Sequence, residues 1–143
     1  ISTNAGGKFD SLLKIASGGE LSRFLLALKV CLTNDQTEVS LVFDEIDRGI
    51  GGATADAVGR RLLQLAQNNA QVLVVTHSPQ VAALADRHFV VLKDIEGEKP
   101  LSRVAQIKGE ESVEEIARMI SGDRITDEAR EASRVLISGA SNP

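Results

Sequence analysis

Residues 39–78 read VSLVFDEIDRGIGGATADAVGRRLLQLAQNNAQVLVVTHS, and this stretch decides the fold class. It begins with a short apolar run at residues 39–43, followed by a glycine-rich loop. The apolar positions of residues 53–67 recur at the spacing of one helical face, and residues 71–75 are a second short apolar run. The stretch therefore predicts a buried strand, a helix and a second buried strand.

Two strands joined by a helix in this way run parallel, and the crossover is nearly always right-handed. The residues that follow the two strands then meet at the carboxyl edge of one sheet, which is where α/β proteins bind ligands. Asp44 and Glu45 follow the first strand, and Thr76 and His77 follow the second. The sequence therefore predicts that these four residues share one edge.

Helices and strands are also expected on both sides of this stretch. Upstream, apolar residues recur at helical spacing through residues 18–32. Downstream, Ser78 and Pro79 match a helix start, which predicts a helix to about Asp86. The remaining expected elements are a strand over residues 88–93, a link at residues 96–100 to a hairpin partner over residues 102–107, a helix over residues 112–121 closed by Gly122, and a helix over residues 127–138 capped by Thr126 and closed by Gly139.

These elements predict an α/β fold in which a mainly parallel sheet is flanked by helices and followed by a hairpin and two helices. We expect residues 1–143 to form one lobe of this kind. Only 3% of the residues are aromatic, so the core must be built mainly from Leu, Val, Ile and Ala, which suits helices on a parallel sheet. The apolar runs are far shorter than the ~20 residues of a membrane-spanning helix.

Charge and cysteine content exclude further classes of site. The net charge is −4, whereas a primary nucleic-acid-binding surface is rich in basic residues. We therefore expect any DNA contact to be made by parts outside this chain. The single cysteine, Cys31, cannot form an internal disulfide and is expected to be a buried thiol. The start of the chain shows no signal peptide, which favours a cytoplasmic protein.

The first candidate motif is Ser17-Gly18-Gly19-Glu20, directly before the first expected helix. Ser17 and Glu20 have the spacing of a capping box, which alone explains them. Two glycines in a first helical turn, however, cost about 1 kcal/mol each relative to alanine. Glycines at a helix start allow an anion such as phosphate to approach the backbone, so both interpretations stay open.

The second set of candidates is acidic residues with a histidine. Asp44 and Glu45 are either ordinary surface acids or a pair in which one holds Mg²⁺ through water and the other orients an attacking water. Asp47 adds a third acid. His77 is either structural or a donor to a terminal phosphate. Lys8 follows two glycines but precedes Phe9, so the spacing of a phosphate-cradling loop is not met there.

Three segments in this order resemble the motifs of ABC-type ATPase heads. ASGGELSR at residues 16–23 resembles the signature motif, VFDEID at residues 42–47 resembles the Walker B motif and D-loop, and VTHS at residues 75–78 resembles the switch histidine. DRGIGG at residues 47–52 and THSPQVAA at residues 76–83 resemble the RecN family of DNA-repair ATPases in particular.

The resemblance implies ATP and Mg²⁺ as cofactors and assigns three residues to hydrolysis. Asp44 would help hold Mg²⁺, Glu45 would polarise the hydrolytic water, and His77 would contact the γ-phosphate. The complete protein would then be an ATPase.

The resemblance also implies a second head as a partner. Ser17, Gly18, Gly19 and Glu20 would touch the ATP bound to the other subunit of a homodimer, and Asp47 would signal across the interface. Hydrolysis would then require two heads with nucleotide between them.

The family places a Walker A lobe and a long coiled coil upstream, and neither motif occurs in residues 1–143. The resemblance therefore implies the C-terminal lobe of the head of a bacterial, cytoplasmic and nucleoid-associated protein of double-strand-break repair, and we expect the chain alone to hydrolyse essentially no ATP. Two alternatives stay open: a structural DNA-bridging protein in which ATP only switches dimerisation, and the nucleotide-binding subunit of a transporter.

Overall fold

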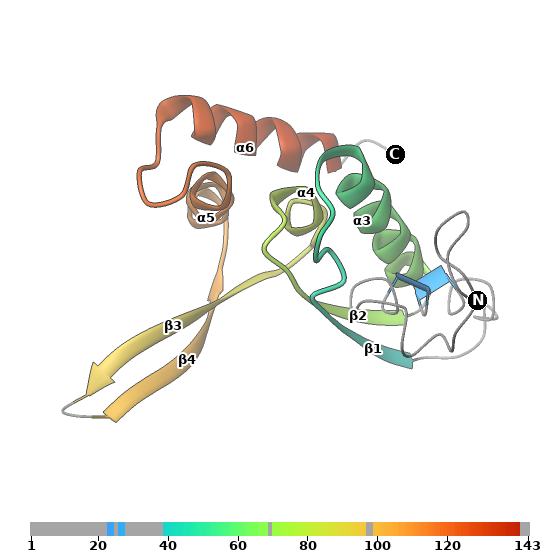
Figure 1. Ribbon diagram of the computed structural model, residues 1–143, viewed down its shortest axis with the longest axis horizontal. Helices are drawn as coiled ribbons and strands as arrows, with labels where there is room; N and C mark the ends of the chain where they lie inside the picture. The colour runs from blue at the N-terminus through green and yellow to red at the C-terminus, as the bar shows by residue number, and fades with distance from the viewer. Residues whose placement is uncertain (1–22, 25, 28–38, 69, 97–98, 141–143) are drawn as a thin grey trace, which may run out of the picture. The chain divides into compact units, whose positions relative to one another are not determined.

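The computed structural model describes residues 23–24, 26–27, 39–68, 70–96 and 99–140 (Figure 1). The chain divides into two compact units, Ile1–Val81 and Ala82–Pro143. Among the described residues, the first unit holds a parallel strand pair and the second an antiparallel one. The fold therefore contains helices with both parallel and antiparallel strands. The sequence predicted a mainly parallel sheet, but the described strands form one pair of each kind.

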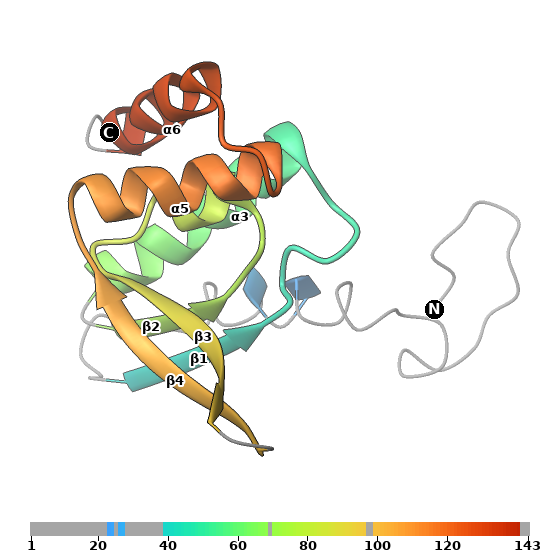
Figure 2. The same ribbon diagram turned by 90° about the vertical axis from the view of Figure 1, so that its left-hand side faces the viewer.

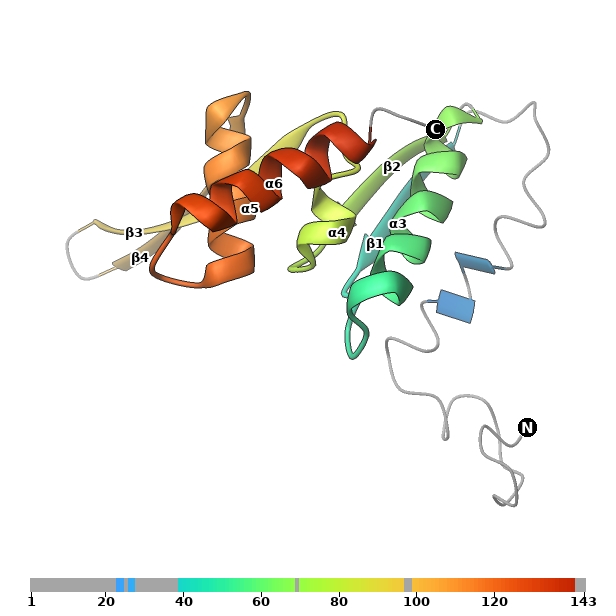
Figure 3. The same ribbon diagram turned by 90° about the horizontal axis from the view of Figure 1, so that it is seen from above.

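The first unit is the strand, helix and strand predicted from residues 39–78. β1 (Val39–Asp44) pairs in parallel with β2 (Ala70–Val75), and α3 (Gly52–Gln67) connects them. In Figures 1 and 3, α3 runs along this strand pair. The prediction is confirmed, with each strand one residue longer than expected.

One face of this strand pair forms the core of the unit. Side chains alternate along a strand, so Leu41 and Phe43 of β1 share a face, and both are buried. The core cluster also takes in residues of α3, the loop before it and β2: Ile46, Ala55, Leu62, Leu65 and Ala70. This face carries the hydrophobic stabilisation of the unit.

The opposite face is apolar but open. Val42 lies opposite Leu73 in the register, and their side chains are 67% and 53% exposed. Val75, at the end of β2, is also 53% exposed. Parallel strands usually bury both faces, so this open face is unusual for a parallel pair.

The helix after β2 is shorter than predicted. α4 spans Pro79–Ala82 instead of continuing to Asp86. The carbonyl oxygen of Ala82 accepts the backbone N–H of Ala85 at 3.1 Å and the Nε2 of His88 at 2.8 Å. Because this carbonyl oxygen already accepts a turn hydrogen bond and one from the His88 side chain, it is not used to continue the helix. The chain then enters the next strand.

The hairpin of the second unit is longer than predicted. β3 (His88–Glu96) pairs antiparallel with β4 (Lys99–Ile107), and the last pair is Glu96 with Lys99 (Figure 2). The sequence placed the whole of residues 96–100 in the connection. Strand pairing therefore continues into residues 96 and 99–100, whose types favour turns. Pairing with the opposite strand overrides this local preference.

Two helices end the described chain, α5 (Glu110–Ser121) and α6 (Asp127–Ala140). The predicted stop of α5 at Gly122 is confirmed, since this glycine adopts φ +76°. The predicted cap of α6 is also confirmed, because the Oγ1 of Thr126 accepts the N–H of Ala129 at 3.2 Å. The predicted stop at Gly139 is wrong: α6 continues through it, and a glycine inside a helix costs only about 1 kcal/mol.

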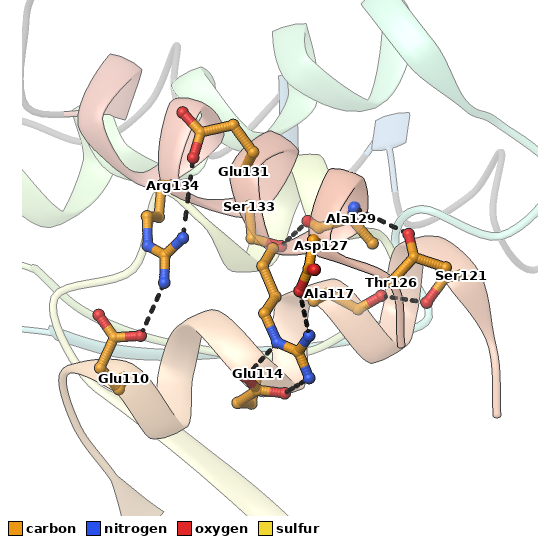
Figure 4. Close-up of polar contacts among 11 residues, drawn as sticks. Glu110, Glu114, Ala117, Ser121, Thr126, Asp127, Ala129, Glu131, Ser133 and Arg134 are labelled. Atoms are coloured by element: carbon orange, nitrogen blue, oxygen red, sulfur yellow. Dashed lines mark hydrogen bonds and ion pairs between the residues drawn. The ribbon is translucent and has the colours of Figure 1, made fainter. Parts of the chain in front are cut away.

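Ion pairs join α6 to α5 (Figure 4). The guanidinium of Arg130 contacts both carboxylate oxygens of Glu114, at 2.6 and 3.3 Å, and Arg134 contacts Glu110 at 3.1 Å. Hydrogen bonds to Glu114, and next to Asp127, raise the pKa of Arg130. The charged side chains of this helix pair therefore bind one another.

Arg23, Phe24, Leu26 and Ala27 are helical, which agrees with the helix predicted over residues 18–32. The other residues of that helix lie outside the described part of the chain. Among the described helices, none has the length and apolar character needed to cross a membrane.

Candidate functional site

The carboxyl edge of the parallel strand pair brings the predicted site segments together. Asp44 is the partner of Val75 in the register, and the backbone N–H of Glu45 donates to the carbonyl oxygen of Val75 at 3.2 Å. The segments after β1 and β2 therefore start side by side. The predicted position of Asp44 and Glu45 next to Thr76 and His77 is confirmed.

Glu45 adopts an unusual backbone conformation. Its φ of +49° is the only positive value among the described residues other than glycine. The left-handed region is disfavoured for residues with a Cβ by roughly 1–2 kcal/mol. Such strain tends to occur where function requires a fixed geometry, so it marks Glu45 as a candidate functional residue.

A tight turn holds Glu45 in this conformation. The N–H of Arg48 donates to the carbonyl oxygen of Glu45 at 3.0 Å, and the Nη1 of Arg48 contacts the Oε2 of Glu45, also at 3.0 Å. Both side chains are exposed, so solvent weakens this ion pair. The carboxylate of Glu45 therefore remains accessible to a ligand, as does that of the exposed Asp44.

Asp47 lies inside the first unit. Its side chain is only 4% exposed, and its Oδ2 accepts the hydroxyl of Thr76 at 2.7 Å. Its Oδ1 is buried and has no hydrogen-bond partner in the described structure. Its expected role across a dimer interface stays a prediction, while the contact to Thr76 is a link within the chain.

The segment after β2 is also held by hydrogen bonds. The Oγ1 of Thr76 accepts the backbone N–H of Ser78 at 2.9 Å, and the Oγ of Ser78 donates to the Oε1 of Gln80 at 2.9 Å. His77 lies between Thr76 and Ser78 in the sequence, and its side chain is exposed. The imidazole is therefore available to a ligand on a backbone that is fixed on both sides.

Two contributions to this site were not predicted from the sequence: the hydrogen bonds of Thr76, whose position at the edge was expected, and the contacts of Arg23. Arg23 donates from Nη1 to the carbonyl oxygens of Ile46 and Arg48, at 3.5 and 3.1 Å. A positioning role for Thr76 could have been inferred from its hydroxyl, which stands next to the candidate histidine. Arg23 is the last residue of the motif at residues 16–23, but no sequence pattern indicates that it reaches the turn after β1.

No family model matches the sequence. Three proteins each named "DNA repair protein RecN" are similar to it. The chain is 42% identical to the one from Halalkalibacterium halodurans over 99% of its own length, 47% identical to the one from Deinococcus radiodurans over 96%, and 49% identical to the one from Treponema pallidum over 86%.

The chain is a RecN-family segment. It spans 25% of the Halalkalibacterium protein, 24% of the Deinococcus protein and 21% of the Treponema protein. The RecN resemblance drawn from the sequence motifs is thus confirmed. What the complete protein does is a separate question, because most of the length of these relatives has no counterpart in this chain.

Of the RecN-like motifs, the diglycine segment cannot be placed. Ser17, Gly18, Gly19 and Glu20 lie outside the described residues, as does Cys31. Their expected roles stay predictions.

The described residues contain no group of three or more side chains suited to hold a metal ion. Mg²⁺, however, usually binds through one or two carboxylates together with waters and substrate phosphates. Asp44 is an exposed carboxylate at the sheet edge, so it fits a magnesium ion that a nucleotide brings with it.

Proposed function

We propose that this chain supplies one edge of an ATP-hydrolysing site in a larger DNA-repair protein, as the C-terminal lobe of an ABC-type head. The observation that carries the proposal is that the segment with Asp44 and Glu45 and the segment with His77 start side by side at the carboxyl edge of one parallel strand pair. Ligand sites in α/β folds form at this edge.

Each of these residues suits one task in phosphoryl transfer. Asp44 would hold Mg²⁺, which neutralises charge on the phosphates when bound. Glu45 would accept a hydrogen bond from the attacking water and orient it, because its carboxylate is exposed at the same edge. His77 would donate a hydrogen bond to the terminal phosphate.

The site also needs parts that this chain lacks. Residues 1–143 contain no phosphate-cradling loop, so we propose that a Walker A lobe of the same protein binds the nucleotide. The open apolar face formed by Val42, Leu73 and Val75 supports this proposal, because a parallel sheet is normally covered on both faces. Without that lobe the chain would bind ATP poorly.

Two further partners belong to the proposal. A second head would face the diglycine motif Ser17-Gly18-Gly19 and complete the site around the nucleotide. DNA would bind elsewhere on the protein, because the net charge of −4 is unfavourable for a phosphate backbone. The proposed protein acts in the cytoplasm at the nucleoid.

The test is phosphate release by the full-length protein that carries Glu45→Gln. We expect the rate to fall on the order of 100-fold or more, since the amide cannot accept the proton of the attacking water, while ATP binding stays within a factor of two. Glu131→Gln, on the exposed surface of α6, is the matched control and should leave the rate unchanged.

An unchanged rate in the Glu45→Gln variant would remove this residue from catalysis. That result would favour the alternative in which ATP only switches head dimerisation in a DNA-bridging protein.

A further inference from the structure

The side chain of Asp47 is buried, although it is a carboxylate with few compensating contacts. Burial of a carboxylate costs free energy unless hydrogen bonds or a cation compensate for it. Here the Oδ2 of Asp47 accepts a hydrogen bond from the hydroxyl of Thr76, and the Oδ1 has no hydrogen-bond partner in the described structure. A residue buried at such a cost is better explained by what it holds in place than by its own contribution to stability.

We propose that Asp47 and Thr76 form a positioning pair that fixes the turn carrying Glu45 relative to His77. This inference rests on the proposed function, because it assigns the two residues a purpose in the same site. Neither residue touches the nucleotide in this account. They act through Glu45 and His77.

The hydrogen bonds around Thr76 fix the backbone on both sides of His77. The hydroxyl accepts the N–H of Ser78 and donates its own hydrogen to Asp47, at 2.9 and 2.7 Å. One hydroxyl therefore links the residue before His77, the residue after it and the turn that follows β1. A valine at position 76 would keep the shape and lose both bonds.

The turn on the other side of the pair is equally constrained. Asp47 lies between Glu45 and Arg48, which are joined by the 3.0 Å bond from the N–H of Arg48 to the carbonyl oxygen of Glu45. Ile46, next to Asp47, has no exposed surface and is part of the core cluster. A displacement of Asp47 would therefore also move Glu45, whose φ of +49° has to be held by the surrounding contacts.

Arg23 holds the same turn from a third direction. Its guanidinium donates to the carbonyl oxygens of Ile46 and Arg48, the two residues that flank Asp47. Arg23 is helical and lies four residues after Gly19 in the sequence. The turn after β1 is therefore tied to the segment after β2 through Asp47, and to the helix that follows the diglycine through Arg23.

A positioning pair predicts effects on the chemical step more than on nucleotide binding, because a misplacement of about 1 Å can slow an enzyme about 100-fold. In the full-length protein, Thr76→Val should lower kcat for phosphate release at least ~10-fold and change KM for ATP less than ~2-fold. Thr76→Ser keeps the hydroxyl and should recover most of the lost rate.

A double-mutant cycle tests whether the two residues act as one unit. Asp47→Ala should slow phosphate release as Thr76→Val does, and the double variant should be no slower than the slower single variant. Asp123→Ala, an exposed acid before α6, is the matched control for removal of a carboxylate. If Asp47→Ala fails to fold, the comparison of Thr76→Val with Thr76→Ser decides the question.

Amide hydrogen exchange of the peptide over residues 44–50 gives a readout that does not depend on ATP. Exchange should be faster in Thr76→Val than in Thr76→Ser. Equal rates of phosphate release in these two variants would overturn the inference, as would multiplied losses in the double variant. An unchanged rate in Glu45→Gln would instead overturn the proposed function, so the two failures are distinguishable.

Discussion

The carboxyl edge of the β1–β2 pair and the α5–α6 helix pair use polar residues in opposite ways. Between α5 and α6, acids and arginines bind each other, and the hydroxyl of Ser133 donates to the carbonyl oxygen of Ala129 within its own helix. At the sheet edge, Asp44 and His77 are exposed, and the Oδ1 of Asp47 has no hydrogen-bond partner in the part of the chain that the structure describes. The helix pair thus completes its own contacts, whereas the edge leaves polar groups exposed, as the proposed ligand site requires.

Backbone geometry separates the same two regions. The helix pair has an ordinary glycine stop at Gly122 and an ordinary threonine cap at Thr126. The sheet edge places Glu45, a residue with a side chain, where glycine would be favoured. The described residues of the helix pair contain no such strained position, and this difference supports the sheet edge as the candidate site.

The largest effect on stability is expected at the base of the site. Ile46→Ala removes a side chain with no exposed surface from the core of the first unit, so the free energy of unfolding should fall by about 2–5 kcal/mol. Ile120→Ala, at a 40% exposed position of α5, is the control and should cost less than about 1.5 kcal/mol. Urea unfolding followed by circular dichroism measures both, and equal losses would contradict the packing described.

A larger side chain in the buried contact of the α5–α6 helix pair should lower the stability of the second unit. Ala117 of α5 is fully buried, so Ala117→Leu should destabilise the second unit by about 1–3 kcal/mol. If the two regions serve separate purposes, amide exchange of residues 44–50 should not change in this variant. Faster exchange there would show that the helix pair supports the site.

Sequence patterns predicted the parts of the fold in which local chemistry decides. Periodicity placed β1, α3 and β2 to within a residue or two, and Thr126 and Gly122 carried recognisable cap signals. They failed where contacts distant in sequence decide. The end of α4 depends on His88, and the length of the hairpin depends on pairing between β3 and β4.

The candidate site was predicted in the same partial way. The order of strand and helix was enough to bring Asp44, Glu45 and His77 to one edge. The burial of Asp47 and the reach of Arg23 over 25 positions of sequence to Arg48 are tertiary contacts, which no local pattern encodes. For this reason the exposed residues and the positions of Asp47 and Thr76 were predicted, while the contact between these two and the role of Arg23 were missed.

A smaller effect is expected from the backbone strain at Glu45. Glu45→Gly and Glu45→Ala both remove the carboxylate and its contact with Arg48, but only glycine relieves the positive φ. The glycine variant should therefore be more stable than the alanine variant by about 1 kcal/mol in urea unfolding. Equal stabilities would mean that the turn relaxes once the glutamate is gone.

The smallest effect is a pH dependence at the start of α6. A backbone hydrogen bond, and next a hydrogen bond from Thr126, lower the pKa of Glu128. A carboxyl with a lowered pKa in the folded state stabilises that state at neutral pH, and this contribution is lost as the pH falls through the lowered pKa. Glu128→Gln should therefore flatten the fall in thermal stability between about pH 7 and about pH 3, and an unchanged profile would contradict this cap.

The central claim is that the ends of β1 and β2 form one reactive edge, and a double-mutant cycle of Glu45→Gln and His77→Ala in the full-length protein tests it most directly. Residues that serve one transition state are not additive, so the double variant should release phosphate no more slowly than the slower single variant. Losses that multiply, or single variants that hydrolyse ATP at the unmodified rate, would contradict the claim.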